Sequence, residues 1–389
     1  MRVLLAPDGF GGLLSPRAAA EAIAAGWRAG APHDELDVCP LADGGPGFVE
    51  TLHAVLGGRL LPVTVRGPWG EPVPATVLLA GDTAYVETAQ AVGLALVPAD
   101  RRDPTRTSSA GAGDLLAVAR EAGARRIVAG LGGSGTNDAG MGMLAALGVA
   151  PGRGVLAGGG GALADATPAD LAGLAALRAD WAGVELVVAC DVDVPLLGFQ
   201  GASAGFSAQK GATPEQAQQL ERALALVSRL AVAALGDAER PDLLSGSPGG
   251  DRLAMAPGAG AAGGLGFGLA LLGGRLVPGS AVVADAVGLD ERLGTCEVVV
   301  TGEGRFDWQS LHGKVVAEVA GRALAHGVPT VVVAGEVLVG RRELAAAGIS
   351  AAYAVASTPA GVEAALADPA GTLTERAAAV ARTWSPPRR

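Results

Sequence analysis

The 389-residue chain has few cysteines and few aromatic residues, and no run of basic charge. Its three cysteines, Cys39, Cys190 and Cys296, lie far apart without a CxxC pair, so we expect buried free thiols in a reducing, cytoplasmic setting. An aromatic content of 3% argues against a protein that stacks bases or sugars on aromatic platforms. The net charge of −10 argues against nucleic acid and anionic membranes as partners.

Long apolar segments are equally scarce. The N-terminal apolar run before Asp8 is too short for a signal peptide. Residues 253–274 carry no charge, but they include eight glycines and Pro257, a composition that makes a poor membrane-spanning helix. We expect a glycine-rich loop followed by a buried helix there, and no membrane partner.

The sequence also lacks the usual hydrolase signatures. It has no HExxH and no GxSxG motif. Its four histidines have no metal-ligand spacing: His33, His53, His312 and His326. Zinc hydrolases and nucleophile-elbow hydrolases are therefore poor interpretations of this chain.

Short apolar runs alternate with helical patterns along much of the chain. Ser15-Pro16, for example, predicts the start of a helix that continues to about Ala29. Alternating strands and helices predict an α/β fold with a doubly wound, mostly parallel sheet. The predicted strands are residues 2–6, 126–129, 184–190, 297–301 and 330–334.

Two blocks depart from this pattern. Residues 59–108 contain short β-type runs between glycine and proline turns, and residues 194–290 hold a long helical stretch, Pro214–Leu235, and the glycine-rich segment. We therefore expect a second, smaller α/β domain formed from these two insertions. The predicted main domain is Rossmann-like and comprises residues 1–58, 109–193 and 291–389.

Lysine and asparagine are rare enough to be informative. The chain has 27 arginines but only Lys210 and Lys314, and its single asparagine is Asn137. All three lie in glycine-rich motifs. Because an ammonium is a compact point charge that guanidinium replaces poorly near phosphate oxygens, these positions are candidates for a binding site.

The most informative motif follows the predicted strand 126–129 and spans residues 130–140, GLGGSGTNDAG. Its glycines allow backbone amides to approach an anion, and the following helix start adds partial positive charge. Asp138 is a candidate cation ligand. The segment fits GxGxxG, but residues 151–164 lack the acidic residue that dinucleotide binding requires. The candidate phosphate-binding residues are Gly132, Gly133, Ser134, Gly135, Thr136 and Asn137.

Acidic residues follow several other predicted strands, at the sheet edge where open α/β proteins bind ligands. Residues 301–314, TGEGRFDWQSLHGK, differ from a P-loop at Trp308 and Val315. Asp191 and Asp193 alternate in direction after strand 184–190, so we expect only one to face the site. The candidates from these motifs are Asp8, Asp43, Gly44, Asp191, Lys210, Glu303, Arg305, Asp307 and Lys314.

Together these motifs resemble the type I glycerate kinase family. The matching segments run in the family's order over nearly the whole chain, and GGSGTNDAGMGML and TGEGRFDWQSLHGK are the most specific of them. The resemblance implies a two-domain α/β enzyme that phosphorylates D-glycerate to 2-phosphoglycerate with ATP and Mg²⁺, in a cleft between the domains. The resemblance is compatible with a homodimer but does not decide the oligomeric state.

We assign roles on this basis as hypotheses. The loop 132–137 and Lys314 would bind nucleotide phosphates, and Lys210 would neutralise the transferring phosphoryl group. Asp191 would act as base or metal ligand, with Glu303 and Asp307 as further Mg²⁺ ligands. The acceptor would be bound by Asp8, Asp43, Gly44 and Arg305.

The sequence departs from the family at two loops. The first family loop usually reads D-S-F-K-G-S, whereas this chain has Asp8-Gly9-Phe10-Gly11-Gly12-Leu13, and Pro46 stands where glutamate is usual. Arg66 or Arg305 could replace the missing lysine. Three alternatives therefore stay open: a kinase for another small hydroxy acid or polyol, a non-catalytic nucleotide-binding relative, and a dinucleotide oxidoreductase.

Overall fold

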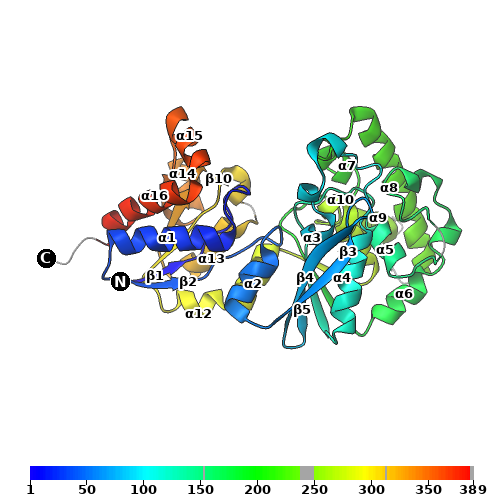
Figure 1. The fold of residues 1–389 in the computed structure, drawn as a ribbon, viewed down its shortest axis with the longest axis horizontal. Helices are drawn as coiled ribbons and strands as arrows, with labels where there is room; N and C mark the ends of the chain where they lie inside the picture. The colour runs from blue at the N-terminus through cyan, green and yellow to red at the C-terminus, as the bar shows by residue number, and fades with distance from the viewer. Residues whose placement is uncertain (152–153, 237–248, 312, 386–389) are drawn as a thin grey trace. The chain divides into compact units, whose positions relative to one another are not determined.

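The computed structural model describes residues 1–151, 154–236, 249–311 and 313–385 (Figure 1). The chain divides into two compact units. Unit 1 consists of residues 1–43, 50–57 and 278–389, and unit 2 consists of residues 44–49 and 58–277.

Unit 1 is built on a five-stranded parallel sheet with the strand order β13-β11-β9-β1-β2. Its central strands are runs of valine and leucine that are buried on both faces, as a parallel sheet covered by helices requires. The strands are β1 (Arg2–Leu5), β2 (Glu35–Val38), β9 (Val298–Thr301), β11 (Thr330–Ala334) and β13 (Ile349–Ala354).

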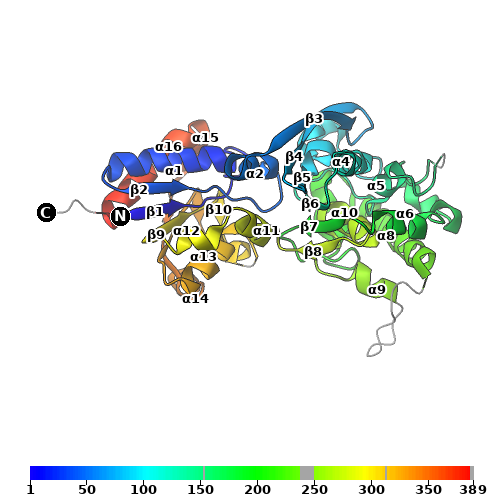
Figure 2. The same ribbon diagram turned by 90° about the horizontal axis from the view of Figure 1, so that it is seen from below.

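Helices cover both faces of this sheet. On one face α1 (Pro16–Gly30) and α16 (Pro369–Trp384) lie side by side, as Figures 1 and 2 show. Gly26 faces the Thr374 carbonyl so closely that a side chain there would clash. α13 (Val315–Ala325) covers the opposite face. The remaining elements are α2 (Phe48–Leu56), which begins in unit 2, α11 (Gly279–Ala286), α12 (Leu289–Leu293), β10 (Arg305–Phe306), β12 (Glu336–Val337), α14 (Arg341–Ala346) and α15 (Pro359–Ala367).

Unit 2 is built on a six-stranded mixed sheet with the order β3-β4-β5-β6-β7-β8. β3, β4 and β5 pair antiparallel, whereas β5 to β8 pair in parallel. The strands are β3 (Arg59–Arg66), β4 (Pro72–Ala80), β5 (Thr83–Glu87), β6 (Arg126–Gly130), β7 (Glu185–Ala189) and β8 (Arg275–Val277).

The expected α/β class with parallel sheets is confirmed, but the expected domain boundaries differ from this division. Residues 109–193 were expected with the N-terminal strand, yet they lie in unit 2, and residues 278–290 lie in unit 1. The reason is the pairing of β5 with β6, from Thr83 opposite Arg126 to Glu87 opposite Gly130. The sequence identifies both strands but not that they are neighbours.

The helices of unit 2 include the predicted Pro214–Leu235, which is α8 with these bounds. Thr213 and Gln216 form a capping box at its start. No described helix combines the length and the apolar character that crossing a membrane requires. The other helices are α3 (Ala89–Val92), α4 (Ala110–Glu121), α5 (Met141–Ala146), α6 (Leu174–Trp181), α7 (Ala202–Phe206), α9 (Gly249–Ala254) and α10 (Ala261–Leu271).

The glycine-rich segment forms a loop and a buried helix, as predicted. Gly263 and Gly264 have φ of +71° and +87°, and their backbones press against Thr136 and Ala139. Ala139 N donates to the Gly263 carbonyl at 3.0 Å. These glycines therefore allow α10 to support the loop that follows β6 by direct backbone contact.

Candidate functional site

The glycine loop after β6 divides into an exposed turn and a buried remainder. Gly133 is exposed and Gly132 is half-buried, whereas Ser134 to Asn137 are buried. The Gly135 amide donates to the Val92 carbonyl at 2.7 Å, so it is used in packing. Only the turn at Gly132 and Gly133 presents backbone to a ligand.

The turn at Gly44 lies against the same strand ends within unit 2. Gly44 has a φ of +97°, and a Cβ on it would lie 2.7 Å from the Ala189 carbonyl oxygen. A Cβ on Gly132 would lie 2.6 Å from the Gly45 Cα. The structure therefore brings the Gly44 turn, the glycine loop and the end of β7 together, and these close approaches require glycine.

Lys210 supplies a buried cation to this edge of unit 2. Its side chain is 3% exposed, and its Nζ donates to Ser134 Oγ at 3.0 Å and to the Thr136 carbonyl at 2.7 Å. Burial lowers the pKa of Lys210 from 10.5 to about 7, although the nearby Asp138 charge opposes this. An ammonium has three N–H donors, and both recorded acceptors are neutral oxygens. The site can therefore accept an anion.

Two further polar groups of the loop are buried without partners among the described residues. Asn137 donates from Nδ2 to Ser203 Oγ at 3.1 Å, but its Oδ1 has no hydrogen-bond partner. The Thr136 hydroxyl oxygen is likewise buried without a hydrogen-bond partner among the described residues. Unsatisfied buried polar atoms cost free energy, so these two are further candidates for ligand contact.

Asp138 links two helices of unit 2 through the hydrogen bonds of its carboxylate. Its carboxylate accepts hydrogen bonds from the Ser109 amide at 2.8 Å, the Ser109 hydroxyl at 2.9 Å, and the amides of Gly140 and Gly142 at 3.1 and 3.2 Å. It thereby ties α4 to the start of α5. Because these four donors already bind the Asp138 carboxylate, its role as a cation ligand stays a prediction.

Asp191 and Asp193 follow β7, as expected, and differ in exposure: Asp191 is half-buried and Asp193 is exposed. Asp191 adjoins Cys190, whose pKa burial raises to about 12, with the Asp191 charge as the second cause. Cys39 is similarly buried, with a pKa of about 11. Such thiols are protonated at neutral pH and are poor nucleophiles, which confirms the expectation of buried, unpaired cysteines for these two.

The carboxyl edge of the unit 1 sheet carries the acidic residues. Asp8, Asp43 and Glu303 follow the neighbouring strands β1, β2 and β9. Asp8 N donates to the Gly302 carbonyl at 2.9 Å, which fixes the first loop beside β9. Parallel strands present their carboxyl ends at one edge, so these three residues follow strands that end at the same edge of the unit 1 sheet.

Glu303 is a buried carboxylate of this edge with a raised pKa. It is 8% exposed, and its Oε1 is buried without a hydrogen-bond partner among the described residues. Burial raises the pKa of Glu303 to about 7; Ser310 and Lys314 lower it, and Asp307 and Asp43 raise it. A cation bound beside Glu303 would offset the free-energy cost of burying its charged carboxylate.

The other residues of this motif surround Glu303. Asp307 accepts from the Gln309 amide at 2.9 Å, and its Oδ2 lies 3.6 Å from Arg305 Nε. Arg305 is itself 65% exposed. Lys314 is half-buried and occupies the N-cap position of α13. The predicted residues of this motif thus share the carboxyl edge of unit 1.

The unit 1 residues suit a hard divalent cation. Mg²⁺ prefers oxygen ligands and often takes only one or two carboxylates, with water and phosphate completing its shell. The unpartnered Glu303 Oε1 meets this need. Over the described ranges no group of three or more His, Cys, Asp or Glu side chains gathers as a preformed metal cage. His312 lies outside the described residues.

Sequence reasoning missed Glu87, at the carboxyl end of β5. It is 6% exposed, pairs in register with Gly130, and accepts from the Val49 amide at 3.2 Å. Its position after a buried strand is the same signal that identified Asp191. Arg66, in contrast, bonds Asp114 through Nε at 2.9 Å and so does not replace the missing lysine of the first loop.

Comparison with known proteins identifies the family of the chain. Residues 3–385 match the sequence profile described as the glycerate kinase family. The chain belongs to the glycerate kinase family. A glycerate kinase of Bacillus subtilis is 40% identical over 362 residues, covering 91% of this chain and 90% of that protein. A glycerate 2-kinase of Escherichia coli is 40% identical over 341 residues, covering 86% and 85%.

A solved structure supports the same family. The crystal structure of a glycerate kinase 2 from Salmonella typhimurium LT2 superposes with a TM-score of 0.77 at 37% identity, covering 99% of this chain and 98% of that one. The resemblance seen in the motifs is confirmed, and the chain is a kinase of this family.

Proposed function

We propose that the enzyme transfers the γ-phosphoryl group of ATP to the 2-hydroxyl of D-glycerate, giving 2-phosphoglycerate and ADP. The observation that carries this proposal is Lys210, a buried ammonium bonded to two neutral oxygens of the glycine loop. A cation held in this way is prepared for a phosphate oxygen, because an anion satisfies both its charge and its remaining donor.

In the proposed reaction the glycerate 2-hydroxyl oxygen bonds to the γ-phosphorus as the bond from that phosphorus to the β–γ bridging oxygen breaks. ADP leaves with the electron pair of that bond. The hydroxyl proton passes to a carboxylate, for which we propose Asp191, half-buried at the end of β7. The chemistry then depends mainly on positioning and on neutralising charge.

Unit 2 would bind the transferring group. The exposed turn Gly132–Gly133 offers backbone to phosphate oxygens, and Lys210 neutralises the charge that develops on the phosphoryl group. Ser134 and Thr136 hold Lys210 in place. Asn137 would use its unpartnered Oδ1 on a ligand donor, while Gly135 would allow the loop to pack against Val92.

Unit 1 would bind the cation and the acceptor. Glu303 and Asp307 would hold Mg²⁺, which when bound offsets the charge of the phosphates. Asp191 of unit 2 is the alternative candidate for a metal ligand. Lys314 would contact nucleotide phosphates. The acceptor glycerate would be bound by Asp8, Asp43, Gly44 and Arg305. The free cysteines suit a reducing cytoplasm.

An ADP-release assay with D-glycerate, ATP and Mg²⁺ tests the reaction. We expect ADP in proportion to glycerate consumed. The ³¹P resonance of the product shows which oxygen was phosphorylated, because a phosphate on the secondary 2-oxygen couples to one proton, whereas one on the primary 3-oxygen couples to two. ADP release without a phosphorylated glycerate would contradict the proposal.

The role of Asp191 has a matched control in Asp193, two residues away and exposed. We expect Asp191→Asn to lower kcat by about 10²- to 10⁴-fold while the fold persists, and Asp193→Asn to leave kcat within about threefold. Near-normal turnover by Asp191→Asn would remove Asp191 from the catalytic residues.

The first loop favours a second candidate, a kinase for a different small hydroxy acid or polyol. Gly11 replaces the usual lysine, and Leu13, 51% exposed, replaces a serine. Phosphorylation assays over a panel of hydroxy acids distinguish the two candidates. A substrate with a kcat/KM above that of D-glycerate would favour the second.

A further inference from the structure

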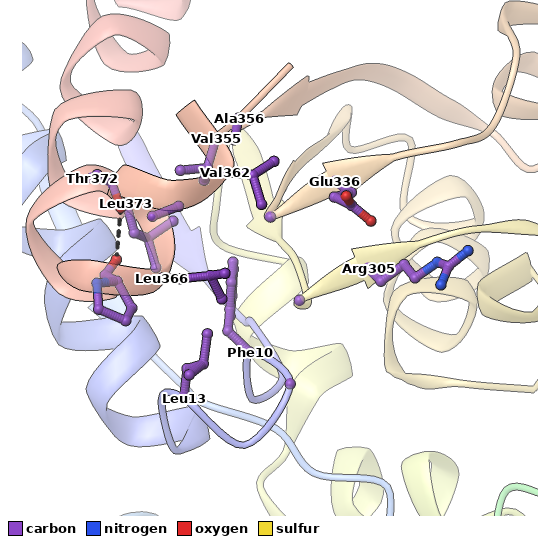
Figure 3. A pocket seen from close by; sticks show the side chains of 15 residues that line it. Phe10, Leu13, Arg305, Glu336, Val355, Ala356, Val362, Leu366, Thr372 and Leu373 are labelled. Atoms are coloured by element: carbon purple, nitrogen blue, oxygen red, sulfur yellow. Dashed lines mark hydrogen bonds between the residues drawn. The ribbon is translucent and has the colours of Figure 1, made fainter. Parts of the chain in front are cut away.

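Unit 1 contains an apolar cavity whose aliphatic lining has no role in the sites described above. It has a volume of about 330 Å³ and lies where the first loop, the ends of β9, β11 and β13, and the helices α15 and α16 meet. Figure 3 shows Phe10, Leu13, Val362, Leu366 and Leu373 gathered around it. This location, at the carboxyl edge of an open parallel sheet, is where such folds bind ligands.

Two charged side chains lie at one end of the cavity. Arg305 of β10 and Glu336 of β12 are opposite each other in register and extend to the same side, away from the aliphatic group (Figure 3). Backbone groups at this end are already paired, since Gly335 N donates to the Glu303 carbonyl at 3.0 Å and Glu336 N donates to the Gly304 carbonyl at 3.1 Å. The cavity thus has an apolar interior and a polar end.

The chain's own sequence keeps this cavity open and apolar. A Cβ on Gly304 would lie 2.7 Å from the Gly11 amide nitrogen, so the floor is formed by backbone in close contact. Leu13 contributes an aliphatic side chain to the wall, so the first loop adds to the apolar lining of this cavity.

We infer that this cavity binds the purine base of the nucleotide, with Glu336 toward the ribose hydroxyls. The inference rests on the proposed function. Of the two proposed substrates, glycerate is small and polar throughout, and only the nucleotide has a flat ring whose faces gain from burial among aliphatic side chains.

The test compares two exposed leucines on helices of unit 1. Leu366 is 59% exposed and lines the cavity, whereas Leu324 is 62% exposed on α13 and does not. The dissociation constants of ADP and of inorganic tripolyphosphate are measured by calorimetry for the wild type, Leu366→Glu and Leu324→Glu. A second cavity variant, Leu13→Glu, changes the first loop instead of α15. An effect shared by both cavity variants is therefore not caused by local misfolding of α15.

We expect both cavity variants to weaken ADP binding by about tenfold or more and to leave tripolyphosphate binding unchanged, with Leu324→Glu like the wild type. Unchanged ADP affinity in both cavity variants would overturn the base site while leaving the kinase proposal intact. If ADP binding weakens as expected but no glycerate is phosphorylated, the base site stands and the proposed acceptor fails. If the wild type does not bind ADP, both fail.

Discussion

The carboxyl edges of the two sheets bury opposite charges. In unit 1, Glu303 is buried with Asp43 and Asp307 nearby, and its pKa rises to about 7. In unit 2, Lys210 is buried with neutral acceptors, and its pKa falls to about 7. Each group is costly to bury in its charged form, and each would be relieved by an ion of the opposite sign.

The opposite buried charges support different proposed ligands for the two sheet edges. A carboxylate with an unpartnered oxygen is suited to a cation, and an ammonium with neutral partners is suited to an anion. Phosphoryl transfer needs both, because a magnesium ion and a cationic side chain share the charge of the phosphates. We therefore interpret Lys210 and Glu303 as ion-binding groups. Their burial lowers the stability of the fold when no ion is bound.

The largest expected effect comes from removing the cation of unit 2. Lys210→Met should lower kcat by about 10²- to 10³-fold, the loss typical of one charge-stabilising donor. Steady-state assays at saturating ATP and glycerate measure this. The exposed Arg341, at the start of α14, gives the control Arg341→Met, which should keep wild-type turnover. A Lys210→Met enzyme with normal kcat would remove the anion role from unit 2.

Removing the carboxylate of unit 1 should change the metal requirement. We expect Glu303→Gln to raise the Mg²⁺ concentration for half-maximal activity by about tenfold or more, because a neutral amide is a weaker ligand than a carboxylate. Glu343→Gln, at an exposed carboxylate on α14, should leave the Mg²⁺ requirement unchanged. Identical Mg²⁺ curves for Glu303→Gln and wild type would show that the ion binds elsewhere.

The glycines of the two units should respond differently to alanine. Gly11 has a φ of +59° with open space around it, so Gly11→Ala should cost only the left-handed backbone, about 1 kcal/mol. Gly263 has a φ of +71°, but its Cβ would collide with the Thr136 carbonyl, so Gly263→Ala should cost clearly more. Urea unfolding measures both, and equal losses would contradict the packing role of the unit 2 segment.

The sequence predicted local elements well because their signals are local. The serine and proline at residues 15–16 start α1, and α8 begins and ends where its capping and periodicity indicate. Acidic residues and glycines after buried strands led to the candidate sites at the two sheet edges, and their functional roles stay predictions. The pairing of β5 with β6 could not be read, because pairing depends on contacts between segments that are distant in the chain.

The same limit applied to single side chains. Asp138 looked like a cation ligand in its motif, but its partners include Ser109, which is 29 residues away. Glu87 was missed because no motif surrounds it, although it ends a buried strand beside Gly130. The sequence indicates which residue types follow a strand, whereas their hydrogen-bond partners are decided by the tertiary fold.

The pH dependence of unfolding tests the opposed buried charges most directly. The Glu303 pKa is raised from 4.5, so the unfolded state loses this proton first and stability falls from pH 4.5 to about 7. The Lys210 pKa is lowered from 10.5, so the unfolded state keeps this proton longer and stability rises from about pH 7 to 10.5.

The measurement is the free energy of unfolding by urea, without metal, for wild type, Glu303→Gln and Lys210→Met across this range. Relative to wild type, the Glu303→Gln variant should gain stability as pH rises from 4.5 to 7, and the advantage of Lys210→Met should shrink as pH rises from 7 to 10.5. Differences from wild type that stay constant with pH, or that change in the same direction for both variants, would contradict the account.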